Sequence, residues 1–88
     1  MKFAVIDGNA VTSMEDIHKT LAQQLAFPEW YGGNLDALHD CLTDLHEETE
    51  LSIVHPEALL ETLGPAYVRL TRVLSNAAEE NPYLKLHL

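Results

Sequence analysis

Short apolar runs along the chain predict three strands. Residues 2–6 form one such run, which stops at Asp7-Gly8, a dipeptide typical of turns. Residues 50–54 form a second run. The segment 83–88 alternates between apolar and polar side chains, as in a strand with one more polar face.

Two helices are predicted between the first and second strands. The first covers about 13–25 and carries Ile17, Leu21 and Leu25 at intervals of one helical turn. Ser13 and Asp16 at its start resemble a capping box with Asp in place of Glu or Gln. The second helix begins after Asn34, a residue type that is favoured at N-caps. Its predicted buried stripe consists of Leu35, Leu38, Leu42 and Leu45.

Two further helices are predicted before the third strand. One covers about 56–63, with Pro56 in its first turn and Gly64 just past its end. The next opens at Pro65 and ends near Asn81-Pro82. Its predicted inward residues are Leu70, Val73, Leu74 and Ala77.

The predicted order of elements is therefore β-α-α-β-α-α-β. Strands joined by helical crossovers run parallel, with right-handed connections. We expect an α/β fold in which a small three-stranded parallel sheet packs against about four helices. A chain of 88 residues fits one domain, so residues 1–88 are expected to form a single domain.

Charge is distributed unevenly along the chain. The formal net charge is -9, and no Lys or Arg occurs between Lys19 and Arg69. Phosphates are bound by Lys and Arg, so direct binding of nucleic acid is not expected. Opposite fields steer protein association, which favours a basic protein as partner. The acidic residues of the cation-free segment are Glu29, Asp36, Asp40, Asp44, Glu47, Glu48, Glu50, Glu57 and Glu61.

The remaining composition points to a cytoplasmic protein without a cofactor. Cys41 is the sole cysteine, which excludes an internal disulfide and suits a reducing compartment. No apolar stretch is long enough to span a membrane, and the first apolar run is too short for a signal peptide. The five histidines show no metal-ligand spacing, and no phosphate loop or nucleophile motif is present.

The richest candidate chemistry lies in residues 28–43, PEWYGGNLDALHDCLT. Asp36 lies in the first turn of the second helix, where a carboxylate favours the helix dipole, so a capping role and a binding role both remain open. Asp40 is mid-helix and has no Lys or Arg one turn away. Asp36 and Asp44 are instead like charges one turn to either side. A sequence that keeps a locally unfavourable arrangement often does so for function, and this favours binding.

Aromatic residues and glycines precede this helix. At least one of Trp30 and Tyr31 is expected to anchor the loop in the core, and the other to be an exposed interface anchor. Gly32 and Gly33 most simply supply positive φ angles. Side chains of His39 and Asp40 diverge by about 100° on a helix, so a catalytic dyad is poorly supported. Cys41 is expected to be a small buried hydrophobe.

The segment 28–43 closely resembles the aromatic-aromatic-Gly-x-Asn-Leu-Asp-Ala-Leu-x-Asp-x-Leu stretch of the barstar family, intracellular inhibitors of secreted ribonucleases such as barnase. The first strand, the helix ending in QLAFP, and the last helix and strand are similar too, but less strongly. The resemblance implies a barstar-like fold and a second helix that plugs a ribonuclease active site. The partner-binding residues that it implies are Trp30, Tyr31, Gly32, Asn34, Leu35, Asp36, His39, Asp40, Thr43 and Asn76.

Three positions depart from the best-known member of the family. His39 and Leu45 stand where that member has tryptophan, and Asn76 stands where it has an acidic residue that contacts the nuclease. The acidic pair Asp36 and Asp40 is retained. These departures bear on which nuclease is the target.

Three hypotheses follow for function. The first is an inhibitor that forms a 1:1 complex, as a monomer, with a basic extracellular-type ribonuclease, protecting its own cell by phosphate mimicry. The second is an acidic interaction or immunity module for another basic toxin or a nucleic-acid-binding protein. The third, an enzyme that uses His39 with Asp36 or Asp40, is the least supported, and no catalysis is expected.

Overall fold

Seven elements follow one another in the predicted order. The computed structural model describes residues 1–88 and has the α/β architecture that the sequence predicts. The elements are β1 (Lys2–Asp7), α1 (Met14–Gln24), α2 (Leu35–Thr43), β2 (Thr49–Val54), α3 (Pro56–Leu63), α4 (Pro65–Glu80) and β3 (Leu84–His87).

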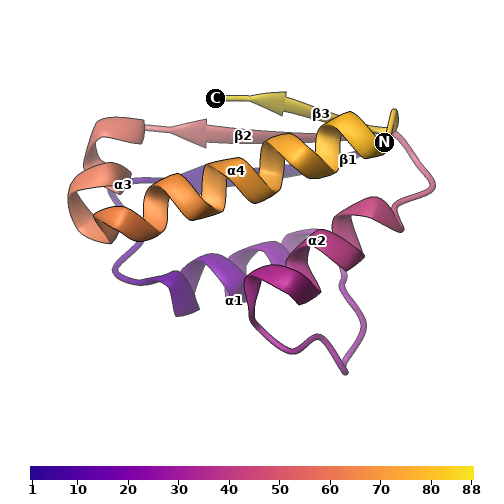
Figure 1. The fold of residues 1–88 in the computed structure, drawn as a ribbon, viewed down its shortest axis with the longest axis horizontal. Coiled ribbons are helices and arrows are strands. Elements are labelled where there is room, and N and C mark those ends of the chain that lie inside the picture. The colour runs from indigo at the N-terminus through magenta and orange to yellow at the C-terminus, as the bar shows by residue number, and fades with distance from the viewer.

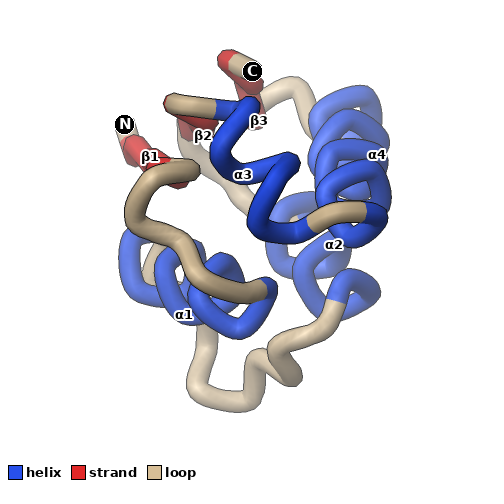
Figure 2. The backbone as a smooth tube through the Cα atoms, turned by 90° about the vertical axis from the view of Figure 1, so that its left-hand side faces the viewer, coloured by secondary structure: helices blue, strands red, loops and turns tan.

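The three strands form one sheet with the order β1-β2-β3, and both pairs are parallel, as predicted. Ala4 pairs with Leu51, and Leu51 in turn pairs with Leu86, so the same face of each strand points to the core. The helices lie on one side of this sheet (Figures 1 and 2). The other side is open, and Phe3 on it is 61% exposed.

The core lies between the sheet and the helices. α1 packs against β1, and α4 against β3. Burying apolar surface contributes roughly 25 cal/mol per Å², and a fully buried leucine about 1.5–3 kcal/mol. The buried apolar residues that form this cluster are Ala4, Ile6, Val11, Ile17, Leu21, Leu25, Leu38, Leu42, Leu51, Ile53, Leu59, Leu70, Leu74, Ala77 and Leu84.

α2 is attached chiefly to α4 (Figure 2). Leu38 and Leu42 are completely buried, whereas Leu35 and Leu45 at the two ends of the stripe pack against the core and stay partly accessible. The four leucines therefore fix which face of α2 points away from the protein. That face carries the carboxylates considered below.

The start of α1 differs in detail from its prediction. Ser13 is the N-cap and accepts a hydrogen bond from the Asp16 amide at 3.3 Å, so the helix proper begins at Met14. The Asp16 carboxylate does not return this bond to Ser13, as a capping box requires. It accepts instead from the amide of Thr12 at 2.9 Å and from the Thr12 hydroxyl. The Asp16 carboxylate thus binds the two donors of Thr12, the residue before the N-cap Ser13, and not Ser13 itself.

Gln24 protects the free edge of β1. Its side-chain oxygen accepts from the Val5 amide at 2.7 Å, and its side-chain nitrogen donates to the Val5 carbonyl at 3.4 Å. Exposed strand edges invite pairing with other chains, and a side chain that occupies the edge reduces this risk. The last turn of α1 thus covers the middle of the edge strand.

Candidate partner-binding surface

The outward face of α2 is acidic because of how the helix begins and packs. Asn34 accepts a hydrogen bond from the Ala37 amide at 2.8 Å, which confirms the predicted N-cap. With the leucine stripe turned inward, Asp36, Asp40 and Asp44 are all exposed. The side chain of Asp40 is 77% exposed. Asp36 and Asp44 take part in no ion pair, and no Lys or Arg contacts Asp40, so this face carries uncompensated negative charge.

Glu80 of α4 extends this face, and it is not among the residues predicted from the sequence. Its carboxylate is hydrogen-bonded to Nε2 of His39. Nδ1 of the same ring lies 3.8 Å from Oδ1 of Asp40, so these two neighbouring side chains approach each other although a helix alone would let them diverge. One signal was available: Glu79 and Glu80 fill the last turn of α4, where acidic residues oppose the helix dipole and no basic residue offsets them.

The carboxylates of Glu80 and Asp40 change the pKa of His39. The hydrogen bond to Glu80 raises the pKa of His39 above its usual value, and the negative charges of Glu80 and Asp40 act in the same direction. His39 is therefore protonated over a wider pH range than an isolated histidine. The imidazole links α2 to α4 at the border of the acidic face.

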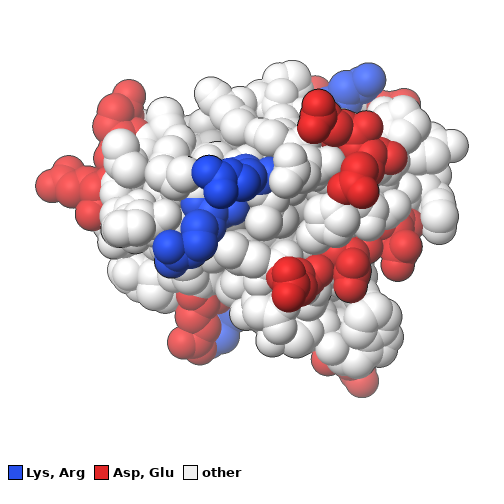
Figure 3. Space-filling model, viewed as in Figure 1, with Lys and Arg blue, Asp and Glu red and all other residues white.

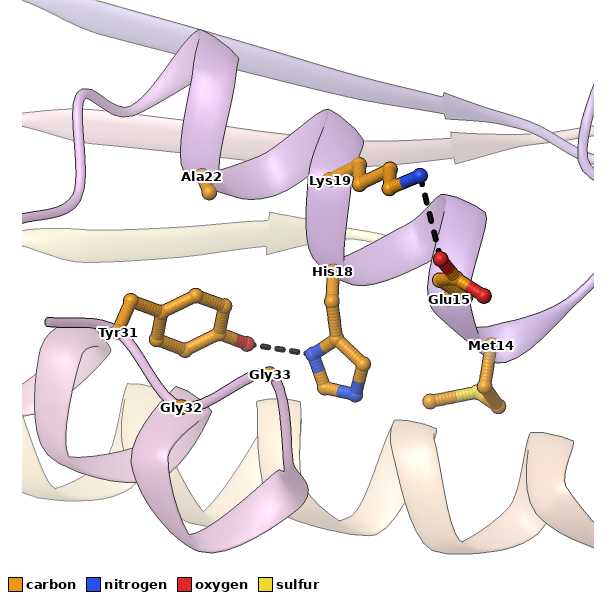
Figure 4. Close-up of a pocket in the computed structure, with 8 residues that line it drawn as sticks. All are labelled: Met14, Glu15, His18, Lys19, Ala22, Tyr31, Gly32 and Gly33. Atoms are coloured by element: carbon orange, nitrogen blue, oxygen red, sulfur yellow. Dashed lines mark hydrogen bonds and ion pairs between the residues drawn. The ribbon is translucent and has the colours of Figure 1, made fainter. Parts of the chain in front are cut away.

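The loop before α2 holds one aromatic residue inside and one outside. Tyr31 packs against the core, with its ring 5.0 Å from that of Phe27, and its hydroxyl is hydrogen-bonded to Nδ1 of His18 (Figure 4). Burial raises the pKa of Tyr31 to about 12 and lowers the pKa of His18. Trp30 is 73% exposed. The predicted division between an anchor and an exposed aromatic residue is thus seen, with Tyr31 as the anchor.

Only one of the two loop glycines has the backbone that was predicted for both. Gly33 has φ +67°, in the left-handed region, with open space around it. Gly32 has no positive φ, so that prediction is wrong for Gly32. The side-chain nitrogen Nδ2 of Asn34 would lie 3.3 Å from a Cβ placed on Gly32. A small residue at this position leaves room for the N-cap side chain.

The remaining candidate residues occupy different environments. The Thr43 hydroxyl donates to the carbonyls of His39 at 2.9 Å and Asp40 at 3.1 Å, so its donor is used within α2. Leu35 packs mainly against the core. Asn76 is exposed on α4, one turn before Glu80. Cys41 is buried as predicted, and burial raises the pKa of its thiol.

Trp30 and the acidic side chains border one another. Trp30 lines a shallow hollow together with Cys41, Asp44 and Leu45 at the end of α2. The acidic face of α2 therefore has Trp30 along one side and the His39–Glu80 pair along the other. A second hollow of about 420 Å³ lies between α1 and the loop, beside Tyr31 and Gly32 (Figure 4).

The charges separate across the molecular surface. Figure 3 shows acidic side chains over α2 and the C-terminal end of α4, further acidic side chains at the opposite end by α3, and basic side chains over the first half of α4. The basic residues of α4 are Arg69 and Arg72, both exposed. No group of three or more His, Cys, Asp or Glu side chains is placed to hold a metal ion. None of the helices has the length and apolar composition needed to cross a membrane.

Comparison with known proteins points to one family. A family model described as "Barstar (barnase inhibitor)" matches residues 1–86. A Bacillus subtilis (strain 168) protein named "Putative ribonuclease inhibitor YrdF" is 49% identical to the chain over 43 residues. The aligned region makes up 49% of this chain and 47% of that protein, so the chain spans about half the length of this relative.

Proposed function

Because the chain belongs to the barstar family, we propose that it inhibits a microbial ribonuclease by covering the enzyme's active site with the acidic face of α2. The observation that carries this proposal is the set of outward carboxylates that no Lys or Arg contacts, Asp36, Asp40 and Glu80, on a surface that Trp30 also borders as an exposed aromatic side chain. Ribonucleases bind RNA phosphates with cationic side chains. A fixed row of carboxylates offers the same charge pattern.

Asp40, Asp36 and Trp30 each have a defined part in this proposal. Asp40 occupies the position of a substrate phosphate and faces the Arg, Lys and His side chains of the enzyme. Asp36 pairs with a basic residue nearby, and Trp30 stacks on the region of the catalytic histidine. Charge-assisted hydrogen bonds of this kind are about twice as strong as neutral ones.

The surrounding contacts hold this surface in place before the partner arrives. Tyr31 is fixed by His18, Asn34 caps α2, and the leucine stripe anchors the helix. Fewer side chains and loop residues then lose freedom on binding, and this favours affinity. We propose a 1:1 complex formed in the cytoplasm, in which the inhibitor catalyses no reaction and the cell that makes it is protected.

Titration calorimetry tests the proposal directly. The wild-type chain is titrated with barnase and with other microbial ribonucleases that prefer guanine, and the hydrolysis of RNA is followed in parallel. Asp40→Ala should weaken binding by at least about thirtyfold, since losing one partner of a buried charge pair costs about 2–5 kcal/mol. Glu61→Ala is the matched control, because Glu61 is an exposed carboxylate on α3, outside this surface.

Two results would count against the proposal. One is the absence of binding to every ribonuclease in the panel, and the other is equal loss of affinity in Asp40→Ala and Glu61→Ala. Binding that leaves RNA hydrolysis unchanged would favour the alternative, an acidic module for another basic toxin or a nucleic-acid-binding protein. His39, Leu45 and Asn76 border the surface. Substitutions at these positions would then test whether they determine which partner binds.

A further inference from the structure

His39 lies where α2 meets α4, with a carboxylate near each nitrogen of its ring. Nε2 is hydrogen-bonded to Glu80 of α4, and Nδ1 lies 3.8 Å from Oδ1 of Asp40 on α2. The His39 side chain is 34% exposed, so solvent reaches it in the free protein. Asp40 and Glu80 are two of the carboxylates that the proposed function assigns to the basic partner.

The charged groups that face His39 are all acidic. From α4 the group is Glu80, and from α2 it is Asp40. Asp36 and Asp44 on α2, and Glu79 on α4, form no ion pair with the imidazole. The basic residues of α4, Arg69 and Arg72, form none either. The hydrogen bond to Glu80 and the charges of Glu80 and Asp40 raise the pKa of His39, so its ring keeps its proton to higher pH than an ordinary histidine.

A protonated His39 and a cationic partner compete for the same carboxylates. Bringing Arg or Lys side chains against Asp40 and Glu80 places like charges close to the imidazolium, and like charges disfavour the charged form. The pKa of His39 is therefore lower in the complex than in the free protein. By linkage, the group that loses its proton on binding makes the affinity rise as pH rises.

We infer that His39 couples the affinity of this surface for a basic protein to pH. The imidazolium N–H proton passes to solvent when the complex forms, and the neutral ring remains at the border of the interface. Binding is weaker in mildly acidic solution and strengthens towards pH 8. This inference rests on the proposed function and adds a form of regulation to the same surface.

The experiment compares wild type with His39→Gln, using barnase as the probe. Affinity is measured by calorimetry between about pH 5.5 and about pH 8, a range that brackets the ordinary pKa of histidine. Each pH is repeated in buffers of different ionisation enthalpy, so that the number of protons released is obtained. The nuclease's own titrating groups contribute equally to both variants and cancel in the comparison.

The expected result is a change in the ratio of the two dissociation constants. Wild type should bind more weakly than His39→Gln at low pH and about as tightly at high pH. The ratio should change about three- to tenfold, because a shift of one pKa unit corresponds to a factor of ten. Wild type should also release more protons than His39→Gln. Glu80→Gln should move the pH dependence of wild type to lower pH.

His87→Gln is the matched control. His87 also forms a surface pair with a carboxylate, Glu50 at 2.6 Å, but lies on β3 in the sheet, away from the acidic face. Its pH profile should follow that of wild type. Parallel profiles for wild type and His39→Gln, with measurable binding in both, would overturn this inference alone. Absence of binding at every pH would reject the proposed function and this inference with it.

Discussion

The side chain of Asn81 is bonded to the backbone of Leu42, and this contact joins the C-terminal ends of α4 and α2. Asn81 Nδ2 donates to the Leu42 carbonyl at 2.9 Å and to the Leu45 carbonyl at 3.0 Å. Its Oδ1 accepts from the Tyr83 amide at 3.0 Å. Only 4% of Asn81 is exposed. One buried amide thus satisfies carbonyls at the end of α2 and ties this end of the helix to the end of α4.

Asn81→Ala should destabilise the fold strongly for a single polar residue. It removes the hydrogen bonds to the Leu42 and Leu45 carbonyls and to the Tyr83 amide, and unmet buried polar groups cost about 1–3 kcal/mol. Urea unfolding followed by circular dichroism measures this loss. Asn76→Ala is the control, since Asn76 is exposed on the same helix, and it should change stability by about 0.5 kcal/mol or less. Similar losses for both variants would show that the buried bonds contribute little.

Much of the fold follows from local patterns in the sequence. The leucine spacing of α2, the cap at Asn34 and the proline at the start of α4 each predict an element, and the structure places each element there. The alternation of helices and strands predicts a parallel sheet, because each helical crossover returns the chain to the same end of the sheet. Periodicity also identifies the face of α2 that carries Asp36 and Asp40.

Contacts between distant segments could not be predicted in this way. The pairing of His39 with Glu80 depends on how far α4 extends along α2. Hydrophobic periodicity predicts which face of each helix is buried, but not the position of one helix along the other. The sequence identifies Asn81 only as the end of a helix, although its side-chain amide donates hydrogen bonds to the carbonyls of Leu42 and Leu45 at the end of α2. Residue type alone predicts a positive φ for both Gly32 and Gly33, whereas only Gly33 has one.

Trp30→Ala should reduce binding to a cognate ribonuclease and leave the fold intact. Trp30 is 73% exposed, so its removal should change the free energy of unfolding by about 0.5 kcal/mol or less. An interface anchor of this type contributes at least about 2 kcal/mol, or roughly a thirtyfold change in affinity. Because it is the sole tryptophan, its fluorescence should shift to the blue on binding. Phe3→Ala, on the open sheet face, should leave affinity unchanged. Equal effects of the two variants would contradict this assignment of Trp30.

Gly8→Ala should be more disruptive than Gly33→Ala. A Cβ on Gly8 would lie 2.1 Å from the backbone oxygen of His55, where β1 meets the turn into α3, so backbone must move. Overpacking of this kind costs typically 1–3 kcal/mol and occasionally more. No atom lies within 4 Å of a Cβ placed on Gly33. Alanine there should lower the free energy of unfolding only by the strain of a left-handed backbone, about 1–2 kcal/mol. Thermal unfolding should therefore rank Gly8→Ala below Gly33→Ala. The reverse order would mean that the β1 turn adapts easily.

Stability should fall in alkaline solution through Tyr31. Burial raises its pKa to about 12 in the folded protein, whereas an unfolded tyrosine loses its proton near pH 10. The neutral phenol is the form that the fold favours, so its contribution is intact below about pH 10. It is lost as the pH rises from about 10 to about 12, because the unfolded chain then binds fewer protons.

Tyr31→Phe should remove this dependence on pH. The variant loses the hydrogen bond to His18 and should be about 1 kcal/mol less stable at neutral pH. Its stability should then decline less steeply than that of wild type above about pH 10. In an absorbance titration of the tyrosines, the late step that the ionisation of Tyr31 produces near pH 12 should disappear. Tyr83→Phe provides the comparison, since Tyr83 is 43% exposed and should leave the late step in place. Retention of that step in Tyr31→Phe would assign it to another group.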